Sequence, residues 1–437
     1  MHNVLIVASH IPPYHQGQVM RVAKLTKYLP DYNWDSIIVS SVTEPGLENI
    51  TDLTADIAKA KKIYRASYIN LVKCYHVVKS IFSINSYKSS PIKNNSTADS
   101  TTGSSLAAQY LLPDYYFTWI PFAVVSGIKA LFTDDIEVIY SLSPLPSNLV
   151  VGYILHKLSG IPWVVDLRDP WTTNPIATKR AYGFLDKIDI WLERILLQTC
   201  SNIVVINKQF ILPLLLQHPA LDPDKFFVVP NGYDPEDFQH IETITFEKFT
   251  IIHSGKFYEN RSPEPFLNAL HLLMMNNPDL ATGIQVKLLG ASDARTAHIV
   301  NQLGLDTVVE LIDFVPHKTS LQYILSTDCL LLIPGPGEST MTGKIFEYLA
   351  AGKPIIALAG KGAASDLISS THTGVVVSPD DVPGIANAIL SMFNLKSTGD
   401  SNAAYCNVDN EVLKQFDRRE IARKVASLLD KIIEGKR

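Results

Sequence analysis

The sequence contains two consecutive series in which short apolar runs alternate with segments of helical periodicity. The first series begins with the apolar run at residues 4–8, and the second begins with FTIIHSG at residues 249–255. This alternation predicts parallel strands joined by helices that cover both faces of a sheet. At 437 residues, the chain is long enough to bury two cores of this kind. We therefore expect two α/β domains with a cleft between them.

Changes in composition set the expected domain boundaries. The first domain covers residues 1–232 and contains an insert at about 83–105, which we expect to be mobile because Ser, Asn, Thr and Lys replace nearly all large apolar residues there. An acidic segment without periodicity, residues 233–248, is the expected linker to a second domain at residues 249–415. Residues 416–437 are predicted to form a final helix that can pack back on the first domain.

Composition excludes several classes of function. The formal net charge of -5 gives no overall attraction to nucleic acid, so we expect no nucleic-acid partner. The four cysteines are scattered and form no CxxC or Cys/His cluster, which favours free thiols in the cytoplasm and argues against a zinc site. The first apolar run is typical of a strand rather than of a signal peptide, and no apolar run reaches the roughly 18 residues of a membrane span.

Two segments leave contact with a membrane surface open. Residues 49–82 are predicted to be helical, with basic residues ahead of an apolar stripe, and residues 111–132 are rich in aromatic residues. Such segments can settle on an anionic membrane surface, although they more often belong to a domain.

The segment TGKIFEYLAAGKPIIAL, residues 342–358, predicts a helix that starts beside one glycine and ends at another. Gly343 is expected to open the helix, and Gly352 to end it in a left-handed conformation. A helix start at the mouth of a parallel sheet suits a phosphate, because unpaired N–H groups and the helix dipole point there. Glu347, one turn further, can accept hydrogen bonds from ribose hydroxyls. The alternative is an ordinary surface ion pair between Lys344 and Glu347.

Three charged residues follow the apolar run Trp163–Val165, namely Asp166, Arg168 and Asp169 in DLRDPW. The run predicts a buried parallel strand, whose carboxyl end is where open α/β sheets bind ligands. We interpret these residues as candidates for catalysis. The alternative is a structural bridge through Arg168.

Signature motifs of other chemistries are missing from the sequence. No GxGxxG follows the first strand, and GPGES at residues 335–339 lacks the GK[ST] ending of a P-loop. There is no serine elbow and no HExxH. Hydride transfer and ATP chemistry lose support, and we expect neither a cofactor nor a bound metal.

The motifs that remain resemble those of the two-domain glycosyltransferases of the GT-B fold, in particular the large retaining group called family 4. The resemblance covers most of both Rossmann-like domains. The family holds the donor diphosphate with a glycine-arginine pair and a later lysine, which here correspond to Gly255, Lys256 and Arg261 with the two cations exchanged. Of the family's two glutamates, Glu347 matches the second, whereas Ser339 occupies the position of the first.

The resemblance also implies the set of donor-binding residues. They are Gly17, Gly255, Lys256, Arg261, Ser339, Thr342, Gly343, Lys344 and Glu347. Gly17 corresponds to the glycine loop that approaches the donor phosphate. DLRDPW, together with PDYYFTW at residues 113–119, is similar to a bacterial branch that assembles surface polysaccharides. Members place a histidine or an acid near the reacting sugar, and Asp166 is expected there.

The function implied by the resemblance is transfer of a sugar from a nucleotide sugar, expected to be UDP-linked, to a polyprenyl-linked or saccharide acceptor. Transfer is expected to be retaining and independent of metal, on the inner face of the plasma membrane. Two alternatives stay open: a nucleotide-sugar 2-epimerase of the same fold, and a catalytically silent sugar- or lipid-binding scaffold, which the serine at position 339 would permit.

Overall fold

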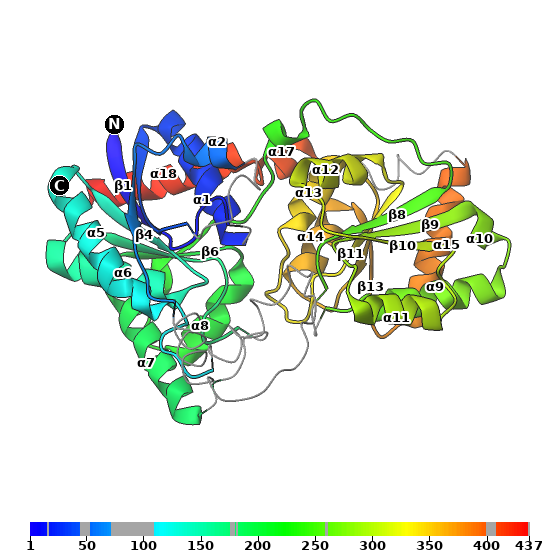
Figure 1. Cartoon of the computed structure of the whole chain (residues 1–437), viewed down its shortest axis with the longest axis horizontal. Helices are drawn as coiled ribbons and strands as arrows, with labels where there is room; N and C mark the ends of the chain where they lie inside the picture. The colour runs from blue at the N-terminus through cyan, green and yellow to red at the C-terminus, as the bar shows by residue number, and fades with distance from the viewer. Residues whose placement is uncertain are drawn as a thin grey trace, which may run out of the picture.

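The computed structural model describes residues 1–14, 17–43, 53–70, 109–174, 180, 182–257, 261–398 and 408–435. These residues form two α/β domains that lie side by side, as Figure 1 shows. The predicted insert at residues 83–105 lies outside the described residues, as do Cys74 and Cys406. Cys200 and Cys329 are buried free thiols.

The first domain is built on a parallel sheet with the strand order β3-β2-β1-β4-β5-β6-β7. Its strands are β1 (His2–Val7), β2 (Trp34–Ser41), β3 (Lys62–Ala66), β4 (Val138–Leu142), β5 (Trp163–Leu167), β6 (Asn202–Val205) and β7 (Phe226–Val228). Its helices are α1 (Gly17–Tyr28), α2 (Thr54–Ile57), α5 (Ile120–Thr133), α6 (Pro146–Ser159), α7 (Gly183–Thr199) and α8 (Ile211–Gln217). The order reverses between β1 and β4, which creates a crevice at the carboxyl ends of these strands.

The second domain repeats this plan with the parallel order β10-β9-β8-β11-β12-β13. Its strands are β8 (Phe249–Ser254), β9 (Ile284–Leu289), β10 (Val309–Ile312), β11 (Cys329–Leu332), β12 (Ile355–Leu358) and β13 (Gly374–Val377). Its helices are α9 (Glu264–Asn276), α10 (Leu280–Gly283), α11 (Ala294–Gln302), α12 (His317–Ser326), α13 (Lys344–Ala351), α14 (Ala363–Thr371), α15 (Val382–Thr398) and α17 (Asn410–Lys414). Here the order reverses between β8 and β11.

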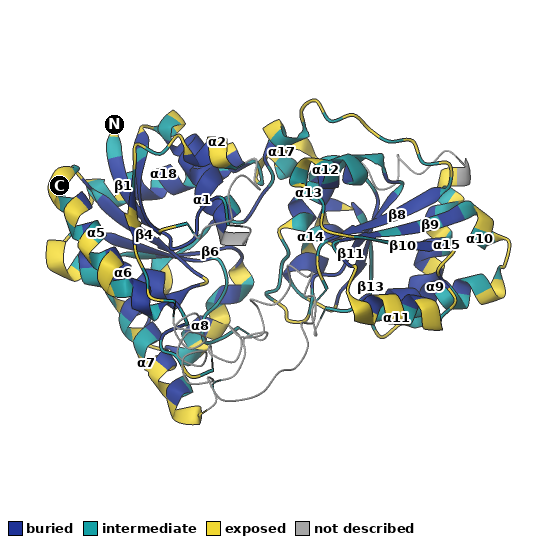
Figure 2. Cartoon of the chain, viewed as in Figure 1, coloured by how far each residue is buried: buried dark blue, intermediate teal, exposed yellow. Residues whose placement is uncertain are grey.

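The central strands of both sheets are buried on both faces, as Figure 2 shows by their dark colour. In the first domain, α5, α6, α7 and α8 cover one face, and α1 covers the other. The strands are therefore nearly continuous apolar runs, as the sequence predicts for parallel sheets. The strand Trp163–Leu167 illustrates this, because Trp163, Val165 and Leu167 point into one core and Val164 into the other.

The last described helix, α18 (Arg418–Glu434), belongs by packing to the first domain. Ile421, Val425 and Leu429 are buried in the same core as residues of α1 and β1. The chain thus crosses between the domains twice, at about residues 233 and 417. The two crossings are held together because Tyr233 N–H donates to Phe416 O at 3.0 Å and Arg418 N–H donates to Tyr233 O at 2.9 Å.

The predicted helix at residues 49–82 is wrong over its described part. That part contains the one-turn helix α2 and the edge strand β3, which pairs with β2 in parallel. Tyr64 and Ala66 are buried, whereas Lys62 and Arg65 are exposed. The alternation of buried and exposed residues in β3 therefore decides its structure, rather than the helical spacing of the residues after it. Residues 71–82 lie outside the described part.

Candidate functional site

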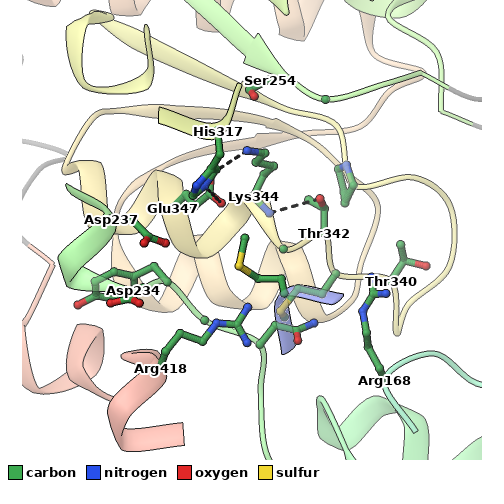
Figure 3. A pocket seen from close by; sticks show the side chains of 18 of the residues that line it. Arg168, Asp234, Asp237, Ser254, His317, Thr340, Thr342, Lys344, Glu347 and Arg418 are labelled. Atoms are coloured by element: carbon green, nitrogen blue, oxygen red, sulfur yellow. Dashed lines mark hydrogen bonds and ion pairs between the residues drawn. The ribbon is translucent and has the colours of Figure 1, made fainter. Parts of the chain in front are cut away.

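A cavity of about 540 Å³ lies between the two domains, at the carboxyl ends of their strands. The first domain contributes Met20 and Lys24 of α1 and Arg168 after β5, while Arg418 comes from α18. The second domain contributes the segment after β8, the loop after β11 and the start of α13. Figure 3 shows the charged side chains converging on this space.

The helix α13 begins and ends where the sequence predicts. Gly343 is its N-cap, and Gly352 ends it with a φ of 62° in the left-handed region. Its apolar face is buried, so the first turn is fixed against the second sheet. Thr342, Gly343 and Lys344 line the cavity, which places the positive end of the helix dipole beside it.

Glu347 lies one turn into α13 and also lines the cavity. Its Oε2 accepts from Lys344 Nζ at 2.8 Å, and its Oε1 lies 3.1 Å from His317 Nε2. Burial raises the pKa of Glu347, but the charges of Lys344 and His317 more than offset this and lower it to about 2. The carboxylate is therefore ionised at neutral pH and can accept hydrogen bonds from hydroxyl groups.

The segment after β8 brings Gly255, Lys256 and Arg261 to the cavity. Gly255 has a φ of 149°, in the region that favours glycine, and an added Cβ would lie 3.7 Å from Arg261 Nη2. The backbone thus runs close to the guanidinium. The nearby His253 is neutral, because burial and then the charge of Arg261 lower its pKa to about 3.

Two predicted donor-binding residues, Gly17 and Ser339, are not among the residues that line this cavity. Gly17 is the first residue of α1. Ser339 is not among the residues that line this cavity, and its carbonyl instead accepts from Asn207 Nδ2 of the first domain at 2.9 Å. The main chain at Ser339 is thus engaged in a contact between domains, and the neighbouring Thr340 lines the cavity in its place.

Asp166 is not at the end of its strand, contrary to the prediction. It lies within β5 and is fully buried, and its Oδ2 accepts from Arg21 Nε and from Tyr140 OH, each at 2.6 Å. Arg21 also donates to Pro230 O at 3.1 Å and is itself fully buried. Burial lowers the pKa of Arg21, but Asp166 more than compensates and the pKa is raised. Through these bonds Asp166 ties α1 to the sheet.

Arg168 and Asp169 follow the strand and have different positions. Arg168 lines the cavity, and in Figure 3 its side chain points toward Thr340. Asp169 is not among the lining residues, and its Oδ2 lies 3.5 Å from Arg168 Nη1. Its backbone N–H donates to Ser143 Oγ at 3.2 Å. Of the three predicted catalytic residues, only Arg168 reaches the cavity.

The predicted linker carries an acidic cluster that the sequence analysis missed. Asp234 is buried, and it accepts from Lys24 Nζ at 2.6 Å, Lys27 Nζ at 2.8 Å and Tyr28 OH at 2.7 Å. Asp237 accepts from Lys24 Nζ at 2.8 Å. Burial raises the pKa of Asp234, but the charge of Lys24 and the hydrogen bonds lower it overall. The lysines at i and i+3 of α1, facing an aspartate-rich segment, are the signal that could have revealed this cluster.

Two features are absent from the described part of the chain, namely a cluster of metal ligands and a membrane-spanning helix. Within it, no group of three or more His, Cys, Asp or Glu side chains could hold a metal ion. No described helix has both the length and the apolar character needed to cross a bilayer.

Residues 248–394 match the family described as Glycosyl transferases group 1. The matched segment makes up most of the second domain and about a third of the chain. D-inositol 3-phosphate glycosyltransferase of Paenarthrobacter aurescens is 25% identical over 191 residues, which cover 41% of this chain and 46% of that protein. The protein of the same name from Stackebrandtia nassauensis is 24% identical over 205 residues, covering 43% and 45%. The matches thus span less than half of these relatives.

Solved structures align with both domains. Sucrose-phosphate synthase of Thermosynechococcus elongatus has a TM-score of 0.68 at 14% identity, and the alignment covers 100% of both chains. Anabaena HepE in complex with UDP-glucose has a TM-score of 0.64 at 14% identity, covering 99% of this chain and 100% of that one. The two facing α/β domains are therefore a GT-B fold.

Proposed function

We propose that the protein is a glycosyltransferase that uses a nucleotide-diphosphate sugar as donor. The observation that carries this proposal is the convergence of Lys256, Arg261 and the start of α13 on one cavity between the domains. Two cations and a helix dipole oppose the negative charge that develops on a diphosphate as the glycosidic bond breaks. Glu347, held ionised beside them, would accept hydrogen bonds from the ribose.

The donor is proposed to be UDP-linked, and the acceptor to be polyprenyl-linked or a saccharide. The UDP-glucose complex of HepE supports the first choice, since that protein shares the fold. Arg168 faces the second domain from DLRDPW and is proposed to contact the donor or acceptor as the domains close. We propose further that the protein belongs to family 4 and acts in surface polysaccharide assembly. Transfer is proposed to be retaining and to need no metal.

Incubation of the full chain with radiolabelled UDP-sugars tests the activity and separates it from its alternatives. A transferase converts the label to product only when an acceptor is added, a 2-epimerase forms the epimer without acceptor, and a silent scaffold binds without turnover. Lys256→Ala should reduce turnover, because it removes a cation from the cavity. The matched control Lys396→Ala removes a lysine that pairs with Asp328 outside the cavity and should leave turnover unchanged. Turnover that is equal in both variants would contradict the assignment of the diphosphate site.

We also propose that the protein binds the inner face of the plasma membrane through α7 and α8. Exposed apolar side chains lie at helical spacing on α7, at Phe184, Ile188 and Trp191, and on α8, at Leu212 and Leu216. The two helices are joined because His218 Nε2 lies 2.9 Å from Glu193 Oε2. Exposed lysines accompany the apolar side chains and suit anionic headgroups; they are Lys187 and Lys208.

Vesicle sedimentation tests the membrane proposal. Binding to vesicles of phosphatidylglycerol, weaker binding to phosphatidylcholine alone, and loss of binding in Trp191→Ser/Leu216→Ser are expected. The matched control Phe314→Ser removes an exposed apolar side chain of the second domain and should bind as the unaltered protein does. Equal binding by both variants, or self-association through this face without vesicle binding, would contradict the proposal.

A further inference from the structure

Arg418 occupies an unusual place at the junction of the two domains. It is the first residue of α18, its side chain lines the interdomain cavity, and only 6% of its surface is exposed. Its backbone is fixed, because Arg418 N–H donates to Tyr233 O and Asp417 forms the N-cap of the helix. Figure 3 shows its guanidinium pointing from α18 into the cavity, below α13.

The guanidinium makes no ion pair and no side-chain hydrogen bond with the described residues. The nearest acids are already engaged, since Asp234 accepts from Lys24, Lys27 and Tyr28, and Glu347 from Lys344. A buried cation without a counter-ion is costly in free energy. Burial, and then the charge of Arg21, lower the pKa of Arg418 to about 9. The guanidinium is therefore charged at neutral pH and lacks a partner.

The position of Arg418 within its helix adds to this cost. A cation in the first turn of a helix opposes the dipole, which favours anions there. Arg419, the next residue, avoids the problem because it is 54% exposed and lies 3.4 Å from Glu236 Oε1. Arg418 thus breaks two local rules, which the charges of Glu347 and Asp234, neither of them in direct contact with it, offset only in part. Such positions tend to be functional.

We propose that Arg418 binds a phosphoryl group that enters the cavity, opposite Lys256 and Arg261. A guanidinium fork matches two phosphate oxygens. The group is either a phosphate of the donor diphosphate or a phosphate carried by the acceptor. This inference rests on the proposed glycosyltransferase and deepens it by assigning a phosphate contact to the helix that returns to the first domain.

The proposal has a mechanical consequence. Arg418 is carried by a helix that packs in the first domain, whereas Lys256 and Arg261 belong to the second. A phosphoryl group held by cations from both sides neutralises their mutual repulsion and favours the closed arrangement of the domains. Arg418 would thus couple the arrival of the anion to closure.

Calorimetric titration of the full chain tests the proposal. The probes are UDP, sodium pyrophosphate, and inorganic phosphate added to the UDP-saturated protein. The variants are Arg418→Gln, Arg418→Lys and the matched control Arg419→Gln. A contact with the donor predicts that Arg418→Gln weakens UDP binding roughly tenfold or more, and that Arg418→Lys restores part of it. A contact with the acceptor predicts unchanged UDP binding and loss of phosphate binding in the UDP complex. Arg419→Gln should bind all three probes normally.

Thermal unfolding of the ligand-free variants separates anion binding from a structural role. Removal of an uncompensated charge should leave the melting temperature of Arg418→Gln unchanged or raise it. A lower melting temperature together with normal binding of all three probes would overturn the proposal, as would equal losses in Arg418→Gln and Arg419→Gln. If the unaltered protein binds no UDP, the proposed function fails. Arg418-dependent binding of pyrophosphate would then still support the anion site, and its absence would overturn the site as well.

Discussion

The buried ion pair between Arg21 and Asp166 allows a test of whether Asp166 stabilises the fold or takes part in the reaction. Asp166→Asn keeps the size of the side chain but removes its charge, which leaves Arg21 as a fully buried cation without its counter-ion. Breaking a buried ion pair on one side costs about 3–5 kcal/mol. For a domain of this size, with a urea m-value of about 2–3 kcal/mol/M, the unfolding midpoint should fall by roughly 1.5 M.

Tryptophan fluorescence during urea unfolding measures this effect in the right domain. All 5 tryptophans lie in the first domain, the last of them at position 191. Arg21→Met/Asp166→Leu should recover much of the lost stability, since it removes both charges. Asp169→Asn, whose carboxyl is 37% exposed, is the matched control and should shift the midpoint little. A normal midpoint combined with lost turnover in Asp166→Asn would refute the structural assignment and return Asp166 to the reaction.

Three further predictions concern the second domain and the junction. Arg261→Ala should weaken UDP binding by about 1.5–3 kcal/mol in calorimetry. The control Arg295→Ala alters an arginine that is 62% exposed and should leave UDP binding unchanged. Equal affinity of the two variants for UDP would count against the phosphate contact of Arg261. The pKa of Glu347 is lowered from 4.5 to about 2, so its contribution to stability is present above pH 4.5 and is lost as the pH falls from there toward 2. This contribution to the free energy of unfolding amounts to at most about 3 kcal/mol. Glu347→Gln should therefore flatten the pH dependence of stability between pH 4.5 and 2, as measured by circular dichroism during unfolding. A variant with the same pH profile as the unaltered protein would disprove this contribution. Gly232→Ala should destabilise the junction by about 1–3 kcal/mol in thermal unfolding, because the new Cβ would lie 1.9 Å from Phe416 O; an unchanged melting temperature would show that the crossing can shift.

The sequence predicts the architecture well because parallel strands and their helices leave strong periodic signals. The bounds of α13 are confirmed, since Gly343 and Gly352 impose them locally. The prediction ended the strand at Val165 and placed Asp166 after it, whereas β5 continues through the apolar Leu167 and includes Asp166. The alternation of the two faces through Leu167 would have placed Asp166 opposite α1, where Arg21 lies.

The missed residues depend on tertiary structure that local patterns do not contain. Arg418 reaches the cavity because α18 returns to the first domain, and the predicted return of this helix does not show which of its residues face the cavity. Lys24 and Asp234 are 210 residues apart and meet through the same folding of the junction. A cation directly after the N-cap aspartate of a helix is a local anomaly that can mark such positions in a sequence.

The packing of α18 has a consequence for the order in which the protein forms during synthesis. The core between α1 and the first sheet includes Ile421, Val425 and Leu429, which the ribosome adds after the whole second domain. The nascent first domain therefore exposes an apolar strip for the time needed to translate about two hundred residues, at about 5–20 residues per second. The cores of the second domain contain residues up to about 416. This domain can therefore finish folding before α18 packs on the first domain and completes its core.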